Sequence, residues 1–345
     1  MKDWQVLHID IYERLISLEN LFLCWQEFRK EKRLKKDVLI FERNLEENIF
    51  ALHEELKNKT YRHQPYNTFR IHDPKPRIIS KASVRDRLVH HMIFNELYRI
   101  LDPGFIYHSY ASRLKRGTHL AVANLFRVSR KVSKNFTQSA FALKCDIYRF
   151  FFSVSHQKLL QIIKNKISDK QLLWLIEEII RSFRAPVDKN LERERERERE
   201  SKGLPIGNLS SQIFANIYLN ELDQFIKHTL HVKYYFRYAD DFLIVHSDEE
   251  YLKSLIKPMA EFLDHRLEMK LHPHKISIRK LRQGIDYLGY VVLPHHIVLR
   301  TKTKRRMFRK INERNKQSYF GLLNHCNSYK LRQDPRFRGD GERVF

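Results

Sequence analysis

Three aspartates could do chemistry together, although they are distant in the sequence. Asp146 follows the apolar run FALKC (141–145), and Asp240 and Asp241 lie at the bend of KYYFRYADDFLIVHS (233–247). Adjacent carboxylates between apolar strands raise each other's pKa unless a cation lies near them. A pair of Mg²⁺ ions, about 4 Å apart, would supply that charge and could hold both the attacking and the leaving oxygen of a phosphoryl transfer.

The alternative for Asp240 and Asp241 is an ordinary turn, because aspartate is common in turns. The tetrapeptide pattern Tyr-x-Asp-Asp is expected only roughly 0.04 times by chance in a chain of this composition. A functional pair of carboxylates is therefore the better interpretation of YADD (238–241).

The charge of the chain indicates a polyanionic partner. It contains 65 Lys and Arg against 41 Asp and Glu in 345 residues, a net charge of +24. Such an excess favours nucleic acid over small acidic metabolites, which would not need it. The 42% of hydrophobic residues is enough for a folded core, and the length suggests about two domains.

Cysteine usage and hydropathy exclude several other classes. Cys24, Cys145 and Cys326 are far apart and form no CxxC pair, which argues against a disulfide framework and a zinc ribbon. Any metal is thus expected on carboxylates. No apolar run reaches the roughly 20 residues of a membrane span, and residues 1–10 lack the apolar core of a signal peptide, so a cytoplasmic setting is expected.

The spacing of apolar residues predicts the elements that must position the aspartates. Spacings of three and four predict helices over most of residues 1–60 and, further on, around 84–97, 121–132, 157–182, 213–225 and 249–267. Extended segments are expected as a hairpin at 66–80, a strand at 141–147, a strand–turn–strand at 233–247, and a hairpin through KISIRK (275–280) and IDYLGYVVL (285–293).

Charged segments interrupt this pattern. The run ERERERERE (192–200) packs neither as a strand nor as a helix, so an exposed disordered insertion is expected near 187–202. The basic stretch RKEKRLKKD (29–37) is either a solvated surface or an RNA-backbone contact. The tail from Arg300 is strongly basic, and its last residues, 333–345, show no core pattern.

Six motifs in order make the chain resemble a reverse transcriptase from about Asn20 to Arg332. They are KPRIIS (75–80) with DRLVHH behind it, YHSYASRLKRGTH (107–119), LKCDIYRFFFSV (143–154), YADD (238–241), HPHKISI (272–278) and YLG (287–289). The resemblance implies an α+β right-hand polymerase with fingers, a palm built on an antiparallel sheet backed by helices, and a short helical thumb.

This resemblance also sets the expected domain boundaries. An N-terminal helical extension would occupy residues 1–60, the fingers 61–140, the palm 141–295 and the thumb 296–345. The palm range would include a fingers-like helical segment at 157–186.

Residue roles follow from the same resemblance. It implies that Asp146, Asp240 and Asp241 are the catalytic carboxylates and that the backbone carbonyl of Ile147 is a further metal ligand. Phe151, five residues after Asp146, matches a steric gate against the ribose 2′-OH. The nucleotide-binding residues are Arg77, with Arg70 or Lys75 as a second cation, together with Phe151, Ile206, Gly207, Gln212 and Lys275 near the departing pyrophosphate. The residues expected along primer and template are Tyr238, Tyr287, Leu288 and Gly289.

One segment departs from the general family pattern. Most reverse transcriptases carry QGxxxSP, whereas residues 206–212 read IGNLSSQ, which resembles the enzymes of diversity-generating retroelements. Those enzymes copy a template RNA and misincorporate opposite its adenines. An isoleucine has no donor or acceptor for the incoming nucleotide, so Ile206 should weaken nucleotide discrimination. The alternative, that Ile206 simply packs, is compatible with this.

The implied activity is RNA-templated DNA synthesis, in which the primer 3′-OH attacks the α-phosphate of a deoxynucleoside triphosphate. The expected cofactor is a pair of Mg²⁺ ions, with Mn²⁺ as an alternative. Expected partners are template RNA, primer or cDNA, deoxynucleoside triphosphates and a small basic accessory protein. Alternatives are a group II intron, retron or defence-type enzyme of ordinary fidelity, and a catalytically decayed RNA-binding protein of the same fold.

Overall fold

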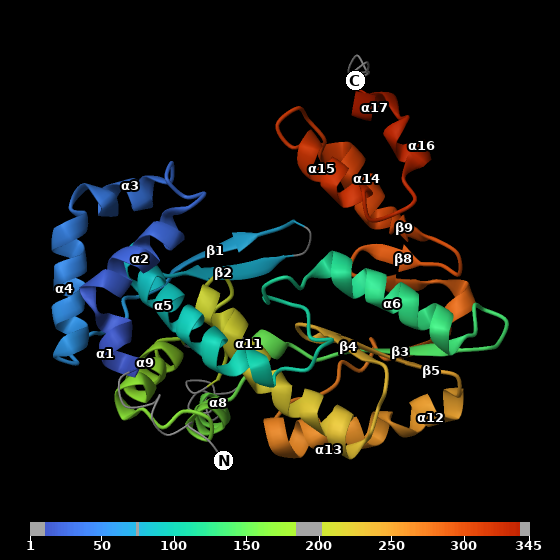
Figure 1. The fold of residues 1–345 in the computed structure, drawn as a ribbon, viewed down its shortest axis with the longest axis horizontal. Helices are drawn as coiled ribbons and strands as arrows, with labels where there is room; N and C mark the ends of the chain where they lie inside the picture. The colour runs from blue at the N-terminus through green and yellow to red at the C-terminus, as the bar shows by residue number, and fades with distance from the viewer. Residues whose placement is uncertain (1–10, 74–75, 184–201, 339–345) are drawn as a thin grey trace. The chain divides into compact units, whose positions relative to one another are not determined.

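The computed structural model describes residues 11–73, 76–183 and 202–338, and its chain divides into two compact units (Figure 1). Unit 1 comprises Met1–Ile106, Tyr148–Asp223 and Phe262–Lys270. Unit 2 comprises Tyr107–Ile147, Gln224–Glu261 and Leu271–Phe345. Helices and antiparallel strand pairs occur together, which confirms the predicted α+β class.

Unit 1 begins with a layer of four helices, drawn in blue in Figure 1. They are α1 (Ile11–Ile16), α2 (Leu18–Arg29), α3 (Lys36–Arg43) and α4 (Leu45–Lys57). The apolar residues that recur every three or four positions face inward, among them Leu21, Trp25 and Phe28 of α2, all buried. Ser17 caps α2 by accepting a hydrogen bond from the backbone N–H of Asn20. The helical expectation for the described part of residues 1–60 is thus confirmed.

The rest of unit 1 is a hairpin and a set of packed helices. The hairpin pairs β1 (Asn67–Ile71) with β2 (Arg77–Lys81), as predicted. The other elements are α5 (Val84–Leu101), η2 (Asp102–Gly104), α7 (Phe150–Ser153), α8 (His156–Lys164), α9 (Lys170–Arg181) and α11 (Leu209–Gln224), whose last residue belongs to unit 2.

Two predicted single helices are each divided in the structure. The expected helix at 157–182 splits into α8 and α9 because Asp169 accepts hydrogen bonds from the backbone N–H groups of Gln171 and Leu172, which starts a new helix. The expected helix at 249–267 splits at Leu255 into α12 (Glu249–Ser254) and α13 (Ile256–Leu267). Pro258 lacks the N–H that a continuous helix would use at this point.

Unit 2 contains two antiparallel sheets. The first has the strand order β4-β5-β3-β6, with β3 (Phe141–Asp146) and β5 (Asp241–His246) in the centre and β4 (Tyr235–Tyr238) and β6 (Ser277–Lys280) at the edges. The second has the order β7-β8-β9, formed by Ile285–Tyr287, Tyr290–Val292 and Ile297–Leu299. Short helical turns, η4 (Phe225–Thr229) and η5 (Leu281–Gln283), complete the connections.

The predicted hairpin between 275–280 and 285–293 is wrong. β6 pairs with β3 in the first sheet, and the segment IDYLGYVVL makes its own hairpin, in which Tyr287 lies opposite Tyr290. The turn between β7 and β8 needs positive φ angles, which Leu288 and Gly289 adopt at 51° and 89°. Because these two residues close a two-residue turn, β7 pairs locally and leaves β6 for the longer sheet.

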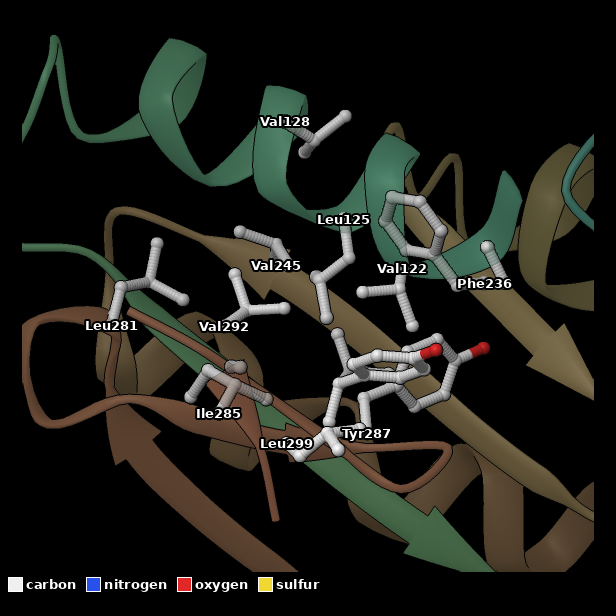
Figure 2. Close-up of a cluster of buried hydrophobic side chains, with 14 of the residues drawn as sticks. Val122, Leu125, Val128, Phe236, Val245, Leu281, Ile285, Tyr287, Val292 and Leu299 are labelled. Carbon is white, nitrogen blue, oxygen red and sulfur yellow. The ribbon is translucent and has the colours of Figure 1, made fainter. Parts of the chain in front are cut away.

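One apolar core holds the two sheets of unit 2 to α6 (Thr118–Val132). Figure 2 shows Val122, Leu125 and Val128 of α6 above side chains from both sheets. The spacing of three and four along α6 places these residues on one face of the helix.

The C-terminal helices are α14 (Thr301–Lys310), α15 (Lys316–Leu323), α16 (Tyr329–Arg332) and α17 (Pro335–Arg338). Residues 333–345 show no core pattern in the sequence, yet Phe337 belongs to the core of unit 2. Its ring is buried and lies 4.9 Å from the ring of Phe320 and 6.3 Å from that of Phe308, measured between centroids. A single aromatic residue in a polar tail carries no periodic signal, so the sequence pattern could not show this.

Two expectations are not tested here. The charged run at 192–200 lies outside the described residues, and the boundaries between fingers, palm and thumb stay predictions. Among the residues that the structure describes, no helix is both long and apolar enough to cross a membrane.

A buried histidine links two helices of unit 1. His90 of α5 is 1% exposed, its Nδ1 lies 2.6 Å from Ser210 Oγ of α11, and its Nε2 lies 3.0 Å from Nε2 of His63. Burial, followed by the charges of His63 and Arg87, lowers the pKa of His90 to about 3. A histidine in the unfolded chain gains a proton near pH 6.5. In the folded protein His90 stays neutral until the pH approaches 3.

The His90→Asn variant should flatten the dependence of stability on pH. A histidine whose pKa is lower in the folded state stabilises fully above its unfolded pKa, about 6.5, and that stability is lost as pH falls toward 3. The wild type should lose about 1.4 kcal/mol per pH unit from this group in that window, and the variant should not. Urea unfolding between about pH 7 and pH 4 measures the difference. The exposed His228 offers a control as His228→Asn, and equal slopes in His90→Asn and wild type would contradict the assignment.

Candidate active site

The strand register of unit 2 brings the predicted carboxylates to one end of the first sheet. Asp146, the last residue of β3, lies directly opposite Asp241, the first residue of β5. Asp240 occupies the two-residue turn between β4 and β5, in which Tyr238 pairs with Asp241. Directly opposite residues project to the same face of an antiparallel pair, so Asp146 and Asp241 share a face. The predicted convergence of these positions is confirmed.

The turn itself has a strained backbone. Ala239 has a φ of 52°, in the left-handed region that non-glycine residues rarely adopt. The short turn fixes Asp240 within one residue of the strand end that carries Asp241. Positive-φ residues of this kind are found at sites where the surrounding structure determines the conformation.

Two lysines of unit 2 neutralise two of the carboxylates. Nζ of Lys144 lies 3.2 Å from Oδ2 of Asp241, and Nζ of Lys275 lies 2.9 Å from Oδ1 of Asp146. Lys144 also donates a hydrogen bond of 3.2 Å to the carbonyl of Asp286. Lys275 was predicted as a site residue, whereas Lys144 was missed. The sequence could have indicated Lys144, because it stands two residues before Asp146 in β3 and so projects to the same face of the strand.

The remaining negative charge shows in the pKa values. Burial, followed by the neighbouring Asp146, raises the pKa of Asp240 to about 6, although its own backbone N–H and Lys275 oppose the shift. Burial also raises the pKa of Asp241, against the effect of Lys144. Oδ1 of Asp241 is buried and has no hydrogen-bond partner in the described residues. The site thus has an excess of carboxylate over cationic charge and an oxygen available for a ligand.

A buried arginine supports the turn from β4. Arg237 is 0% exposed, and its guanidinium donates hydrogen bonds to the carbonyl of Ala239 at 3.3 Å and to Oγ of Ser109 at 3.0 Å. Its backbone N–H donates to the carbonyl of His108, and its carbonyl accepts from the N–H of Tyr110. Arg237 was not predicted, although a lone arginine inside the apolar run of β4 was a usable signal.

Of the residues predicted to lie along the primer and template, Tyr287 is buried in the core, whereas Tyr238, Leu288 and Gly289 are partly exposed. The ring of Tyr287 is fully buried, so its side chain cannot contact a nucleic acid and any contact is left to Leu288 and Gly289 in the turn. A Cβ on Gly289 would lie 3.3 Å from Oγ1 of Thr303. Tyr238 is half-buried, and its hydroxyl accepts a hydrogen bond of 3.4 Å from Thr118.

Unit 1 contains a separate cavity at the hairpin that was predicted to bind a nucleotide. Its volume is about 400 Å³. The cavity is lined by two guanidiniums and an imidazole together with apolar side chains: Arg70, Arg77, His72, Pro76, Ile78, Phe152 and Ile206. Guanidiniums beside an apolar floor suit a ligand that combines phosphates with a flat ring.

The segment that contains Ile206 is fixed to β2. The carbonyl of Ile206 accepts a hydrogen bond of 2.9 Å from the N–H of Ser80, and the side-chain amide of Asn208 donates one of 2.7 Å to the carbonyl of Ser80. Gly207 has a φ of 116°, and a Cβ there would lie 2.8 Å from Ile79. Glycine is therefore required at this position, and the Ile206 side chain is held at the cavity.

Not every predicted nucleotide-binding residue lines this cavity. Phe152 lines it and Phe151 does not, and the role of Phe151 as a steric gate stays a prediction. The ring of Phe151 instead lies 5.2 Å from that of Phe150. Gln212 is exposed on α11 and does not line the cavity either, and Lys75 lies outside the described residues. Ile147 is buried and forms a backbone bridge with Leu271.

Comparison with known proteins agrees with this geometry. The family described as reverse transcriptase (RNA-dependent DNA polymerase) matches residues 70–292. Protein YkfC of Escherichia coli is 25% identical over 279 residues, which cover 69% of this chain and 69% of that protein. The group II intron-encoded protein LtrA of Lactococcus lactis is 24% identical over 310 residues, covering 71% of this chain and 49% of LtrA.

A solved structure with a similar fold is telomerase from Candida albicans in complex with a fragment of telomeric RNA. It superposes with a TM-score of 0.51 at 12% identity, covering 77% of this chain and 52% of that chain. The chain thus spans about half the length of LtrA and of this telomerase. The family match covers β2 of the hairpin, both central strands and the YADD turn, and this chain belongs to the reverse transcriptase family, whose members are RNA-directed DNA polymerases that use divalent metal ions.

Proposed function

We propose that this chain synthesises DNA on an RNA template by transfer of a deoxynucleotide to a primer 3′-OH. The observation that carries the proposal is the register of β3 and β5, which sets Asp146 opposite Asp241 with Asp240 in the adjoining turn. Three carboxylates at one strand end, two of them raised in pKa by burial, have no structural need to be there. A catalytically decayed protein would not be expected to keep all three.

The donor atoms of the site suit a hard divalent cation. Carboxylate oxygens are what Mg²⁺ and Mn²⁺ prefer, and the buried Oδ1 of Asp241 has no other partner in the described residues. A bound pair of Mg²⁺ ions, with Mn²⁺ as the alternative, would lower the pKa of the primer hydroxyl and offset the charge of the leaving pyrophosphate. Across the described residues, no three acidic, histidine or cysteine side chains are already arranged as a closed cation cage.

The lysines explain why such a cage is not closed. The ammonium groups of Lys144 and Lys275 lie against Asp241 and Asp146, where they supply the positive charge that the carboxylates require. When the two lysines leave these carboxylates, the oxygens of Asp146 and Asp241 can bind divalent cations. Lys275 is then free to contact an anion that leaves the site, which is the role that the family resemblance suggested for it.

The cavity of unit 1 supports the assignment of the nucleotide. Arg70 and Arg77 can contact a triphosphate through charge-assisted hydrogen bonds, and Phe152 together with Ile206 offers an apolar surface. In unit 2, α14 and α16 line a groove of about 540 Å³ with Lys304, Arg305, Arg309 and Lys330. Such a groove suits a phosphate backbone, so template RNA and primer are the proposed partners.

A finer proposal concerns fidelity. We infer that the enzyme is the error-prone, adenine-mutagenic reverse transcriptase of a diversity-generating retroelement, because the apolar Ile206 lines the cavity in place of a hydrogen-bonding glutamine. A group II intron, retron or defence-type enzyme of ordinary fidelity is the alternative, and the match to LtrA favours that class. A small basic accessory protein and a cytoplasmic setting belong to the same proposal.

Asp240→Asn should abolish primer extension on an RNA template while RNA binding persists. The change replaces a carboxylate that would bind the metal by a neutral amide and leaves the basic surface of the protein unchanged. Extension of a labelled primer and a filter-binding assay measure the two properties. Asp264→Asn on the exposed surface of α13 is the matched control. Extension by Asp240→Asn at the control's rate would remove the polymerase assignment.

Lys144→Met should destabilise the metal-free protein by about 1 to 2 kcal/mol, because Asp241 loses its counter-charge. Added Mn²⁺ or Mg²⁺ should stabilise the variant more than the wild type. Urea unfolding with and without the cation measures this, and Lys280→Met at the exposed end of β6 is the control. Equal stabilisation of variant and wild type by the cation would show that it does not bind these carboxylates.

Ile206→Gln should reduce misincorporation opposite template adenines. The glutamine restores a hydrogen-bonding group at the cavity, which improves discrimination between nucleotides. Sequencing of cDNA copied from a defined RNA measures the error at each template base, and the other three bases serve as the internal control. Faithful copying of adenines by the wild-type chain would exclude the retroelement proposal and leave the polymerase proposal standing.

A further inference from the structure

Lys144 contacts two segments of unit 2 at once. Its Nζ lies 3.2 Å from Oδ2 of Asp241 and donates a hydrogen bond of 3.2 Å to the backbone carbonyl of Asp286 in β7. One ammonium group therefore connects the central strands of the first sheet, β3 and β5, with a strand of the second sheet. Of these two partners, only Asp241 belongs to the carboxylates that were predicted to bind metal.

A divalent cation on Asp241 would displace this ammonium group. Both are positive, and like charges a few ångströms apart repel each other in a partly buried site. The side chain of Lys144 is only 30% exposed, so water would compensate incompletely for the lost counter-charge. The displaced ammonium group therefore requires another acceptor nearby.

The carboxylate of Asp286 is the acceptor that the fold offers. Burial raises the pKa of Asp241, and Lys144 opposes this shift. The charges of Asp146 and Asp286 add to the shift, so both carboxylates lie close enough to act on Asp241. Asp146 would itself bind a cation, and this leaves Asp286 as the partner for Lys144.

The carboxylate of Asp286 has a fixed position. Nη1 of Arg300 lies 3.2 Å from Oδ1 and 3.3 Å from Oδ2 of Asp286. Arg300 precedes α14, and its backbone N–H donates a hydrogen bond of 3.0 Å to the carbonyl of Gly289, in the turn that follows β7. A carboxylate has about four acceptor positions, so Asp286 can accept from Lys144 without releasing Arg300.

We propose that Asp286 is a positioning residue that receives the ammonium group of Lys144 when divalent cations occupy the carboxylates of the candidate active site. The proposal rests on the proposed function, because it assumes that these carboxylates bind cations. Lys144 pairs with Asp241 in the metal-free protein and with Asp286 in the cation-bound protein. The exchange keeps the ammonium group paired in both states, which reduces the electrostatic penalty of cation binding.

Binding of Mn²⁺ to the full chain, without nucleotide or nucleic acid, tests this exchange. Asp286→Asn keeps the backbone carbonyl but removes the charge, so it should weaken Mn²⁺ binding by about three- to fivefold, as for loss of one partly exposed ion pair. Asp286→Glu keeps the charge and should bind within about twofold of the wild type. Electron paramagnetic resonance of the free Mn²⁺ measures the dissociation constants. Unchanged binding in Asp286→Asn would overturn the proposal.

The same substitution in a Lys144→Met background separates the exchange from a simple loss of negative charge. There Asp286→Asn should weaken Mn²⁺ binding by a clearly smaller factor, because no ammonium group remains to be received. Equal factors in both backgrounds would overturn the proposal, since Asp286 would then act on the cation by its field alone. Glu250→Gln in α12, at a side chain that is 79% exposed, is the matched control and should not change binding.

A crystal structure of the Mn²⁺ complex would show the acceptor directly. Nζ of Lys144 should lie within about 4 Å of a carboxylate oxygen of Asp286. An Nζ that stays on Asp241 beside a bound cation would overturn the exchange and leave the metal site standing. Absence of Mn²⁺ binding by the wild type would instead contradict the metal site of the proposed function, so the two failures are distinguishable.

Discussion

The candidate site depends on one antiparallel pairing, that of β3 with β5. Asp146 and Asp241 are separated by almost a hundred residues in the chain and meet because six consecutive residue pairs hold the two strands in register. A shift of one residue would send either side chain to the opposite face of the sheet. Ala142 of β3 and, two residues apart on β5, Leu243 and Val245 belong to the core that includes α6, which favours this register. The chemistry of the site is therefore a consequence of the core shown in Figure 2.

Electrostatics sets the second constraint. Three carboxylates at one strand end would repel one another in a partly buried environment, and two lysines reduce this repulsion in the metal-free protein. Lys144 comes from the same strand as Asp146 and pairs with the aspartate of the other strand. Lys144 thus belongs to the sheet itself and Lys275 to the segment that leads into β6, so both counter-charges are positioned by the fold.

Much of this arrangement could be predicted from the sequence, because strands β3, β4 and β5 have strong apolar signals and a short turn between them. The three aspartates and the hairpin at 66–80 were identified from such local patterns, whereas Lys275 was identified from the resemblance to the family. The pairing of β6 with β3 and the burial of Phe337 were not, since both depend on contacts between distant segments. Lys144 and Arg237 were missed for a different reason: each acts through a partner that only the folded chain supplies. The presence of Phe152 at the cavity was not predicted either, because the short helix α7 decides which ring reaches it.

The attachment of residues 108–110 to Arg237 has a further effect on the sheet that bears the carboxylates. β4 is an edge strand, and an edge strand with free backbone groups can recruit a strand from another molecule. The N–H of Arg237 donates to the carbonyl of His108 and its carbonyl accepts from the N–H of Tyr110, so the chain's own loop occupies the backbone groups of this residue. At the opposite edge, β6 ends in the charged residues Arg279 and Lys280, which disfavour strand addition. Both borders of the sheet are thereby made less open to the addition of a strand from another molecule, and the central pair β3 and β5 stays enclosed between them.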